Sequence, residues 1–327
     1  MAEPGLGQKI SATFDAVAPT LQDETIKNNG LLEALEKKGN IQPVTGGNNI
    51  RHNIEYAENS SGIWYSGNQR LNLSVSDFIT AAQFEYKQFA INLQMSGEEL
   101  IKNAGDAQLV PLLASKIRNK ATTIKNTMGR ACYGDGTGSG GKELGGLQLL
   151  ISTTPALGIV GGIDASLWEF WRNTSFRAIN DGGSATSAEN IVDYLDAMYV
   201  QLIRKASGDK PQLHVCDNDY YSKYKKSLKS IQRITDRKNE GLSGDYMYEG
   251  ATVVLDGGIG GACPFQHWYM INTDHLMLRP SSVRNNVNVG GDRHSFDQDA
   301  YINFNFWAGN LTCNSRITQG VLSEGGF

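Results

Sequence analysis

The sequence predicts a mixed α+β fold, and three observations support this class. Glycine accounts for 37 of the 327 residues (37/327, about 11%), above the average share of about 7%, which favours turn-rich β structure over a helical bundle. Apolar side chains alternate with smaller or polar ones across residues 89–95, which is the period of a half-buried strand. Apolar residues then recur at spacings of three and four across 109–132, which predicts one long helix.

A long β-hairpin with little core of its own is predicted for residues 46–77. Its apolar and aromatic stretches are separated by the turn-prone run 58–62. An isolated two-stranded hairpin is marginally stable in water, and exposed aromatic side chains need a surface to cover them. We therefore expect the hairpin to lie on a neighbouring subunit. The residues expected to make this contact are Trp64, Tyr65 and Arg70.

Shorter patterns predict the remaining elements. Residues 1–45 hold weakly periodic pieces broken by Pro19, Gly30 and Gly39, and we expect an arm there rather than a domain. Ser76 is expected to cap a short helical piece. After the long helix, the sequence predicts a strand at 147–151, helices near 167–179 and 188–206, and strands at 213–216, 252–255, 268–272 and 301–307.

Composition argues against several classes of function. The 30 Lys and Arg are balanced by 34 Asp and Glu, so the basic excess of a dedicated nucleic-acid binder is missing. No run approaches the roughly 18 apolar residues of a membrane span, and the N-terminus lacks a signal-peptide pattern. The widely spaced Cys132, Cys216, Cys263 and Cys313 fit buried thiols better than a disulfide framework or a zinc site.

Motifs that would carry catalysis are weak. The five histidines show no metal-binding spacing, and no nucleophile motif occurs, so we expect no enzyme activity, metal or cofactor. Gly136–Lys142 matches the start of a phosphate-binding loop. However, Glu143 stands where Ser or Thr is needed, the loop follows a helix, and residues 144–146 cannot open the helix that would hold a phosphate. A nucleotide-binding enzyme is the less favoured alternative.

Basic residues are concentrated in two stretches. No acid occurs across 107–133, which predicts a positive polar face on the long helix, although a merely solvated face has the same pattern. A second basic segment at 223–238 precedes acidic residues at 240–274, and adjacent surfaces of opposite charge suit head-to-tail self-association. A nucleic-acid-binding module that weakens with salt is another reading of this segment. The basic residues of the long helix are Lys116, Arg118, Lys120, Lys125 and Arg130.

The order of these elements resembles the major capsid proteins of tailed bacteriophages that have the Hong Kong 97 fold. The similarity extends over most of the chain from about residue 45. The segments that carry it are Ala81–Ala90, Ser96–Leu100, Asn103–Gly105, the long helix closed by Tyr133–Gly138, and Trp307–Arg316 with Gly320.

The resemblance implies a division of the chain into five parts. These are an N-terminal arm at 1–45, an extended E-loop hairpin at 46–77, a P-domain with its strand and spine helix at 78–150, an A-domain at 151–280, and a return to the P-domain at 281–327 that ends against the A-domain. One feature departs from some members, because no lysine occurs between Lys38 and Lys87. The E-loop therefore has no amine for an isopeptide crosslink.

The resemblance also implies the function. Copies of the chain would assemble into the hexamers and pentamers of an icosahedral phage head around double-stranded DNA, with a virion location after assembly in the host cytoplasm. Implied partners are a scaffolding protein, the portal and, in some shells, a decoration protein, with only non-specific proximity to DNA and no membrane. An encapsulin-like compartment that stores enzymes is the alternative with the same fold.

Overall fold

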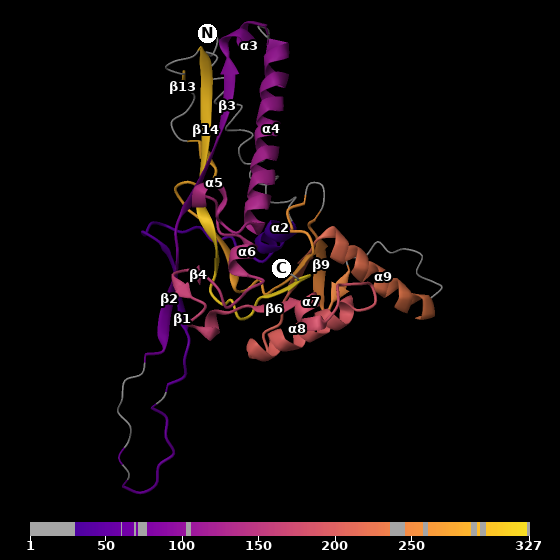
Figure 1. Ribbon diagram of the computed structural model, residues 1–327. Helices are drawn as coiled ribbons and strands as arrows, with labels where there is room; N and C mark the ends of the chain where they lie inside the picture. Colours follow the sequence, from indigo (N-terminus) through magenta and orange to yellow (C-terminus); the bar gives the residue numbers. More distant parts are fainter. Residues whose placement is uncertain are drawn as a thin grey trace.

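The computed structural model describes residues 30–59, 61–68, 70, 77–102, 106–235, 246–257, 261–288, 293–294 and 299–325. The described chain has three parts (Figure 1). An upright layer of helix and strands stands above a body of sheet and helices, and a long extension leaves the body on the opposite side.

The upright layer consists of one long helix beside two long strands. Strand β3 (Lys87–Ser96) pairs antiparallel with β14 (Ala300–Cys313) along its whole length, from Ser96 opposite Ala300 to Lys87 opposite Gly309. Helix α4 (Asp106–Tyr133) packs on β3. The strand expected at 89–95 and the helix expected at 109–132 are both confirmed.

A capping box joins β3 to the short helix α3 (Gly97–Lys102). The backbone N–H of Glu99 donates to Ser96 Oγ at 3.2 Å, and the Glu99 carboxylate accepts from the backbone N–H of Ser96 at 3.2 Å. This reciprocal pair satisfies two backbone donors that a helix start leaves unpaired. It ends the strand at a defined residue.

Strand β14 continues from the upright layer into the body. It pairs there with β11 (Leu276–Pro280), and along its earlier half with β12 (Val287–Asn288) and β13 (Arg293–His294). The predicted strand at 301–307 is therefore the first half of a strand that is twice as long. Strand β14 thus connects the upright layer to the body.

The body is built on a mixed six-stranded sheet that is buried on both faces. Successive side chains of its strand β10 (His267–Ile271) enter different cores, because alternate residues of a strand point to opposite faces. The strand order is β6 (Thr174–Arg177), β15 (Gly320–Ser323), β10, β7 (Leu213–Cys216), β9 (Ala251–Leu255) and β8 (Met247–Tyr248).

Two helices cover one face of this sheet. Helix α8 (Ile191–Lys205) packs on β6, on β15 and on α9 (Asn218–Thr235), and the apolar face of α8 is fully buried. The helix expected at 188–206 and the strands expected at 213–216, 252–255 and 268–272 are confirmed. The basic segment at 223–238 lies mostly in α9, which ends at Thr235.

The other face of the sheet is covered partly by α2 (Gly30–Lys37), where the sequence predicted an arm. Leu31, Leu32 and Leu35 of this helix are buried in the main core. Residues 30–45 therefore belong to the body, because three leucines on one short helix bury more apolar surface than an arm in water can tolerate. Residues 1–29 lie outside the described residues.

The structure corrects three further elements. Residues 147–150 form a helical turn, α6 (Leu147–Leu150), in place of a strand. The helix expected at 167–179 is replaced by a 3-10 turn η1 (Glu169–Trp171), by β6 and by the start of α7 (Ala178–Gly182). Residues 79–84 are strand β2 rather than the helical piece expected after Ser76. Short apolar runs are compatible with either a strand or a buried helix, so the segments against which they pack decide which of the two forms.

Smaller elements complete the described chain. They are the glycine turn α5 (Gly138–Gly141) and the paired strands β4 (Ile159–Val160) and β5 (Ile163–Asp164). Among the described helices, none combines the length and apolar character that a membrane crossing requires.

Candidate assembly surfaces

The extension begins as two paired strands and continues as a segment that belongs to no sheet in its described part. Strand β1 (Ile50–Glu55) pairs antiparallel with β2 (Ile79–Phe84). The partner of β1 therefore lies beyond the predicted hairpin boundary at residue 77. The described residues between the two strands form no further strand and extend away from the body (Figure 1).

The residues predicted for contact lie on this extension. Trp64 is fully exposed (101%), Tyr65 is 66% exposed, and Arg70 is exposed as well. Exposure of a whole indole ring to water is unfavourable, because burial of its apolar surface lowers the free energy. The structure thus presents Trp64, Tyr65 and Arg70 to solvent on a segment without a core, which is the placement that an intermolecular contact needs.

Aromatic packing holds the base of the extension against the body. The Tyr56 ring stacks on Phe170 with centroids 5.3 Å apart and meets Trp168 edge-on at 5.6 Å. The Gln83 backbone N–H donates to the Gly161 carbonyl at 2.8 Å. The orientation of the base is therefore fixed by the same chain, whereas Trp64 at the tip is fully exposed.

His52 lies buried where β1 meets the body. Its Nε2 is 3.0 Å from Thr312 Oγ1 on β14, and its ring meets Phe84 edge-on at 6.1 Å. Burial, and secondarily the positive charge of Arg279, lower the pKa of His52 to about 4. The joint of the extension is therefore built around a neutral imidazole.

The basic residues of α4 do not form one continuous positive face. Lys116 pairs with Glu99 at 2.5 Å, and this bond holds the pKa of Glu99 below its usual value. Lys120 is only 3% exposed, and its Nζ donates to Asn305 Oδ1 at 3.0 Å. Arg118 is exposed.

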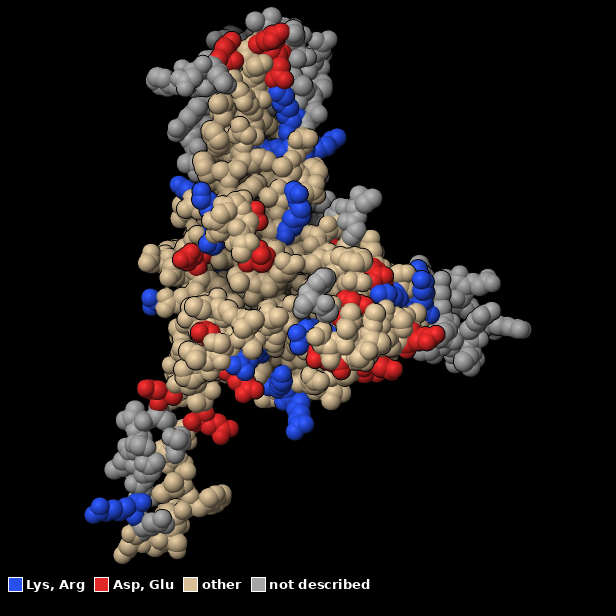
Figure 2. Space-filling view, in the orientation of Figure 1, with Lys and Arg blue, Asp and Glu red and all other residues tan. Residues whose placement is uncertain are grey.

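Of the other two predicted members, Arg130 is exposed near the end of α4, and its Nε donates to the Asn126 carbonyl at 3.2 Å. The side chain of Lys125 lies outside the described residues. Figure 2 shows blue side chains spaced along the upright layer, with tan surface between them. The expected positive face is thus reduced to separate cations, because Lys120 points into the sheet.

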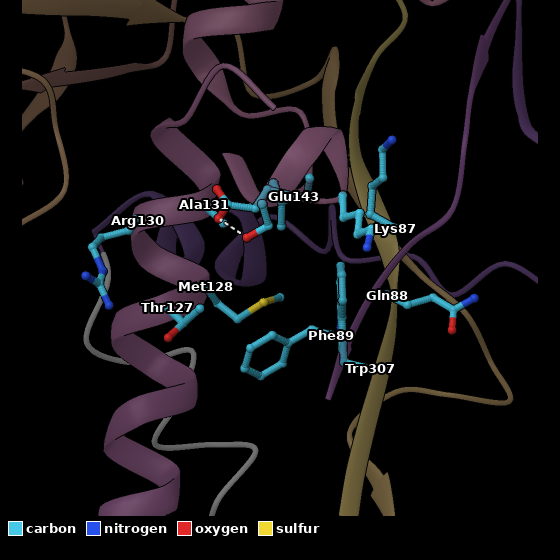
Figure 3. Close-up of a pocket in the computed structure, with 12 residues that line it drawn as sticks. Lys87, Gln88, Phe89, Thr127, Met128, Arg130, Ala131, Glu143 and Trp307 are labelled. Carbon is cyan, nitrogen blue, oxygen red and sulfur yellow. Dashed lines mark hydrogen bonds between the residues drawn. The ribbon is translucent and has the colours of Figure 1, made fainter. Parts of the chain in front are cut away.

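A pocket of about 570 Å³ lies between the end of α4, the glycine turn and the strands β3 and β14 (Figure 3). Its large apolar side chains include Phe89 on β3, Met128 on α4 and Trp307 on β14. The other lining residues are Lys87, Gln88, Thr127, Arg130, Ala131, Ser139, Lys142, Glu143 and Leu144. The pocket thus combines an aromatic interior with a charged rim.

The glycine turn beside this pocket has the wrong geometry for a phosphate-binding loop. The backbone N–H of Gly141 donates to the Thr137 carbonyl at 2.9 Å, so this amide is used within the turn. The Glu143 carboxylate lies so close to Gly138 that a Cβ at this position would clash with it. A phosphate would meet this negative charge, and α6 is a single turn rather than a helix with an anion-binding end.

Asn310 fixes the chain after this turn to β14. Its Oδ1 accepts from the Gly145 N–H at 3.1 Å, and its Nδ2 donates to the Glu85 carbonyl at 2.9 Å. One side chain therefore joins the glycine-rich segment, the start of β3 and β14. The glycine turn has a structural anchor that determines the shape of the pocket.

Buried Arg316 holds together the segment that leads from α6 to β6. Its guanidinium donates to the carbonyls of Leu150 at 2.7 Å and Trp171 at 3.0 Å, and to Asn173 Oδ1 at 3.2 Å. Burial lowers its pKa to about 10, so it remains charged at neutral pH. In the sequence, Arg316 stands out only as part of the segment Trp307–Arg316, because no local pattern reveals that carbonyl-type oxygens of three other residues converge on its side chain.

Sequence reasoning also missed the pocket and the aromatic packing at Tyr56. Phe89 was identified as one face of a strand and Trp307 as part of another strand, but the pairing of those strands was not predictable from either pattern. Within the described ranges, no group of three His, Cys, Asp or Glu is arranged to hold a metal ion. The four cysteines are free and buried, and burial raises the pKa of the Cys132 and Cys313 thiols to about 12.

Comparison with known proteins gives structural matches only. No family model and no curated protein sequence matches the chain. A chain of the capsid asymmetric unit of cyanophage A-1(L) superposes with a TM-score of 0.60 at 12% identity, covering 87% of this chain and 90% of that one. A chain of Gordonia phage Cozz gives a TM-score of 0.54 at 14% identity, covering 95% and 87%.

A third match comes from the capsid of a native GTA particle, with a TM-score of 0.50 at 12% identity, covering 88% of this chain and 89% of that one. These likenesses extend over most of each chain, since 87% or more of this chain and of each matched chain is covered. On this evidence, the chain has the fold of phage capsid proteins.

Proposed function

We propose that this chain is the major capsid protein of a tailed phage, and that its copies assemble into hexamers and pentamers of an icosahedral head around double-stranded DNA. The observation that carries the proposal is the fully exposed Trp64 on an extension without a core, in a chain with the fold of phage capsid proteins. Such an extension has a physical reason to exist only if another molecule covers it.

In this proposal the extension at 46–77 is the E-loop, and α4 with β3 and β14 belongs to the P-domain at 78–150 and 281–327. The six-stranded sheet with α8 and α9 forms most of the A-domain at 151–280. The role is structural, and weak contacts repeated around a closed shell supply its stability. A scaffolding protein, a portal and a decoration protein are the expected partners, with assembly in the host cytoplasm and a final place in the virion.

The charge of the chain suits a wall around packaged DNA. A net charge of −4 gives no strong general attraction to nucleic acid, so DNA can be packed and released without adhering to the shell. The cations of α4 are spread out, and two of them are already engaged by Glu99 and Asn305. Contact with DNA is therefore expected to be non-specific.

Electron microscopy of the purified chain tests the proposal, with the chain expressed alone and together with its neighbouring genes. Closed shells, tubes or rings of five or six copies are the expected result. A chain that stays monomeric in both settings at high concentration would overturn the proposal. Particles that enclose an enzyme encoded by a neighbouring gene, with no DNA, would instead indicate the encapsulin-like alternative.

A further inference from the structure

Two surfaces of this chain are chemically complementary: an exposed aromatic segment and a pocket lined by aromatic side chains. The tip of the extension presents Trp64 and Tyr65, which are 101% and 66% exposed and which no described residue covers. The pocket beside α4 has an aromatic interior formed by Phe89 and Trp307, together with Met128 (Figure 3). Aromatic rings gain from packing in offset or edge-on arrangements, beyond the burial of their area.

The tip cannot fill the pocket of its own chain. In Figure 1 the extension leads away from the body on the side opposite to α4 and α5, which border the pocket. The base of the extension is also held in this direction by the stacking of Tyr56 on Phe170. Any contact between tip and pocket therefore joins two copies of the chain.

We propose that the pocket beside α4 receives the aromatic tip of the extension of a second copy, with Trp64 inserted among Phe89, Met128 and Trp307. This inference rests on the proposed function and adds the receiving surface to it. The cations Lys87, Arg130 and Lys142 line the same pocket. A cation close to the face of an indole is attracted by its ring electrons, so this rim favours a tryptophan.

The charges of the two surfaces also match. Among the described residues between β1 and β2, Arg70 is the one cation. Among the pocket-lining residues, Glu143 is the one carboxylate, and it is exposed while accepting from Ser139 Oγ at 3.0 Å. Arginine binds a carboxylate with two parallel hydrogen bonds. We assign Arg70 of one copy to Glu143 of the next.

Disulfide crosslinking tests which surfaces meet. A Tyr65→Cys protein is mixed with a Thr127→Cys protein under assembly conditions and oxidised, because Thr127 lines the pocket from α4. Thr122→Cys is the matched control, an exposed threonine on the same helix outside the pocket lining. All four native cysteines are buried, so they contribute little background. We expect at least tenfold more linked dimer with Thr127→Cys than with Thr122→Cys.

Charge reversal provides the second test. Arg70→Glu and Glu143→Arg should each lower the yield of assembled particles at least tenfold, and the double variant should recover most of it. Arg70 lies on the unsupported extension, so its variant cannot fail by unfolding the body, and the thermal unfolding midpoint of each monomer is measured as a check.

The outcomes separate the inference from the proposed function. Particles that form with equal crosslinking at residues 122 and 127, and without recovery in the double variant, overturn the pocket assignment and leave the capsid function intact. A wild-type chain that forms neither particles nor crosslinked dimers, alone or with its neighbouring genes, overturns both.

Discussion

Lys120 of α4 donates a hydrogen bond from Nζ to Asn305 Oδ1 of β14 at 3.0 Å, and both side chains are almost completely buried. A second asparagine, Asn303, lies 3.5 Å from the same ammonium. A buried charge is tolerated only when polar groups replace its water. The pairing therefore ties the long helix to the long strand by a buried polar contact.

We predict that Lys120→Met lowers the free energy of unfolding by about 2 kcal/mol, because it leaves a buried amide oxygen without its donor. Arg118→Met is the matched control, since Arg118 is exposed on the same helix, and it should change stability by no more than about 0.5 kcal/mol. Urea unfolding of the unassembled chain measures both. Equal effects of the two variants would show that the contact of Lys120 with Asn305 is energetically unimportant.

Arg316→Lys should destabilise the chain by about 3 kcal/mol, although it keeps the charge. A lysine has no planar fork, so it cannot reach the Leu150 and Trp171 carbonyls and Asn173 Oδ1 together. The comparison variant is Arg172→Lys. Arg172 also donates to two carbonyls but is partly exposed, so water can replace its bonds. Thermal unfolding that shifts equally in both variants would contradict the special role of Arg316.

Trp64→Ala is expected to abolish or strongly reduce particle formation without changing the stability of the monomer. The indole is fully exposed within one chain, so its removal leaves no cavity there, whereas an interface would lose its largest apolar group. Light scattering reports assembly and urea unfolding reports the monomer. Trp64→Phe should restore part of the assembly. An alanine variant that assembles normally would remove Trp64 from the proposed interface.

The stability of the chain should fall as the pH is lowered from about 7 to about 5. The pKa of folded His52 is about 4, below its ordinary value of 6.5, so the unfolded chain takes up the proton first. The resulting stabilisation is complete above pH 6.5 and is lost as the pH falls toward 4. For His52 this amounts to about 2 kcal/mol over the stated range.

The variant His52→Gln should have a shallower dependence of unfolding free energy on pH than the wild type. The pKa of the buried His214 is also lowered to about 4 by burial, so part of the slope should persist in this variant. Urea unfolding at several pH values measures the difference. Superimposable pH profiles of variant and wild type would exclude His52 as a contributor.

The regular elements of the chain could be predicted because they depend on local spacing. The alternation across residues 89–95 became β3, and the three-and-four spacing across 109–132 became α4. Both patterns are long, so the wrong period would leave many apolar side chains in water. The exposed tip at Trp64 was predictable for a related reason, since residues 46–77 contain too little apolar material to cover it.

The orientation of the basic residues on α4 could not be predicted from spacing alone. At 100° per residue, Arg118 and Lys120 lie at about the same angle, roughly 80°, on either side of the centre of the buried stripe. This stripe consists of Ile117, Ala121, Ile124, Met128 and Cys132. Helix geometry alone therefore predicts the same exposure for Arg118 and Lys120. Lys120 is buried because β14 extends along its side of the helix and supplies Asn303 and Asn305.

By itself, the sequence determined the mixed fold class, the long helix, the alternating strands and an aromatic tip that a single chain cannot cover. Only the tertiary structure decided that residues 30–45 join the core, that β1 pairs with β2, and that Phe89 and Trp307 share a pocket. The physical reason is the range of the interactions. Periodicity is set by neighbours along the chain, whereas strand partners, buried cations and pockets are set by segments that meet only when the chain folds.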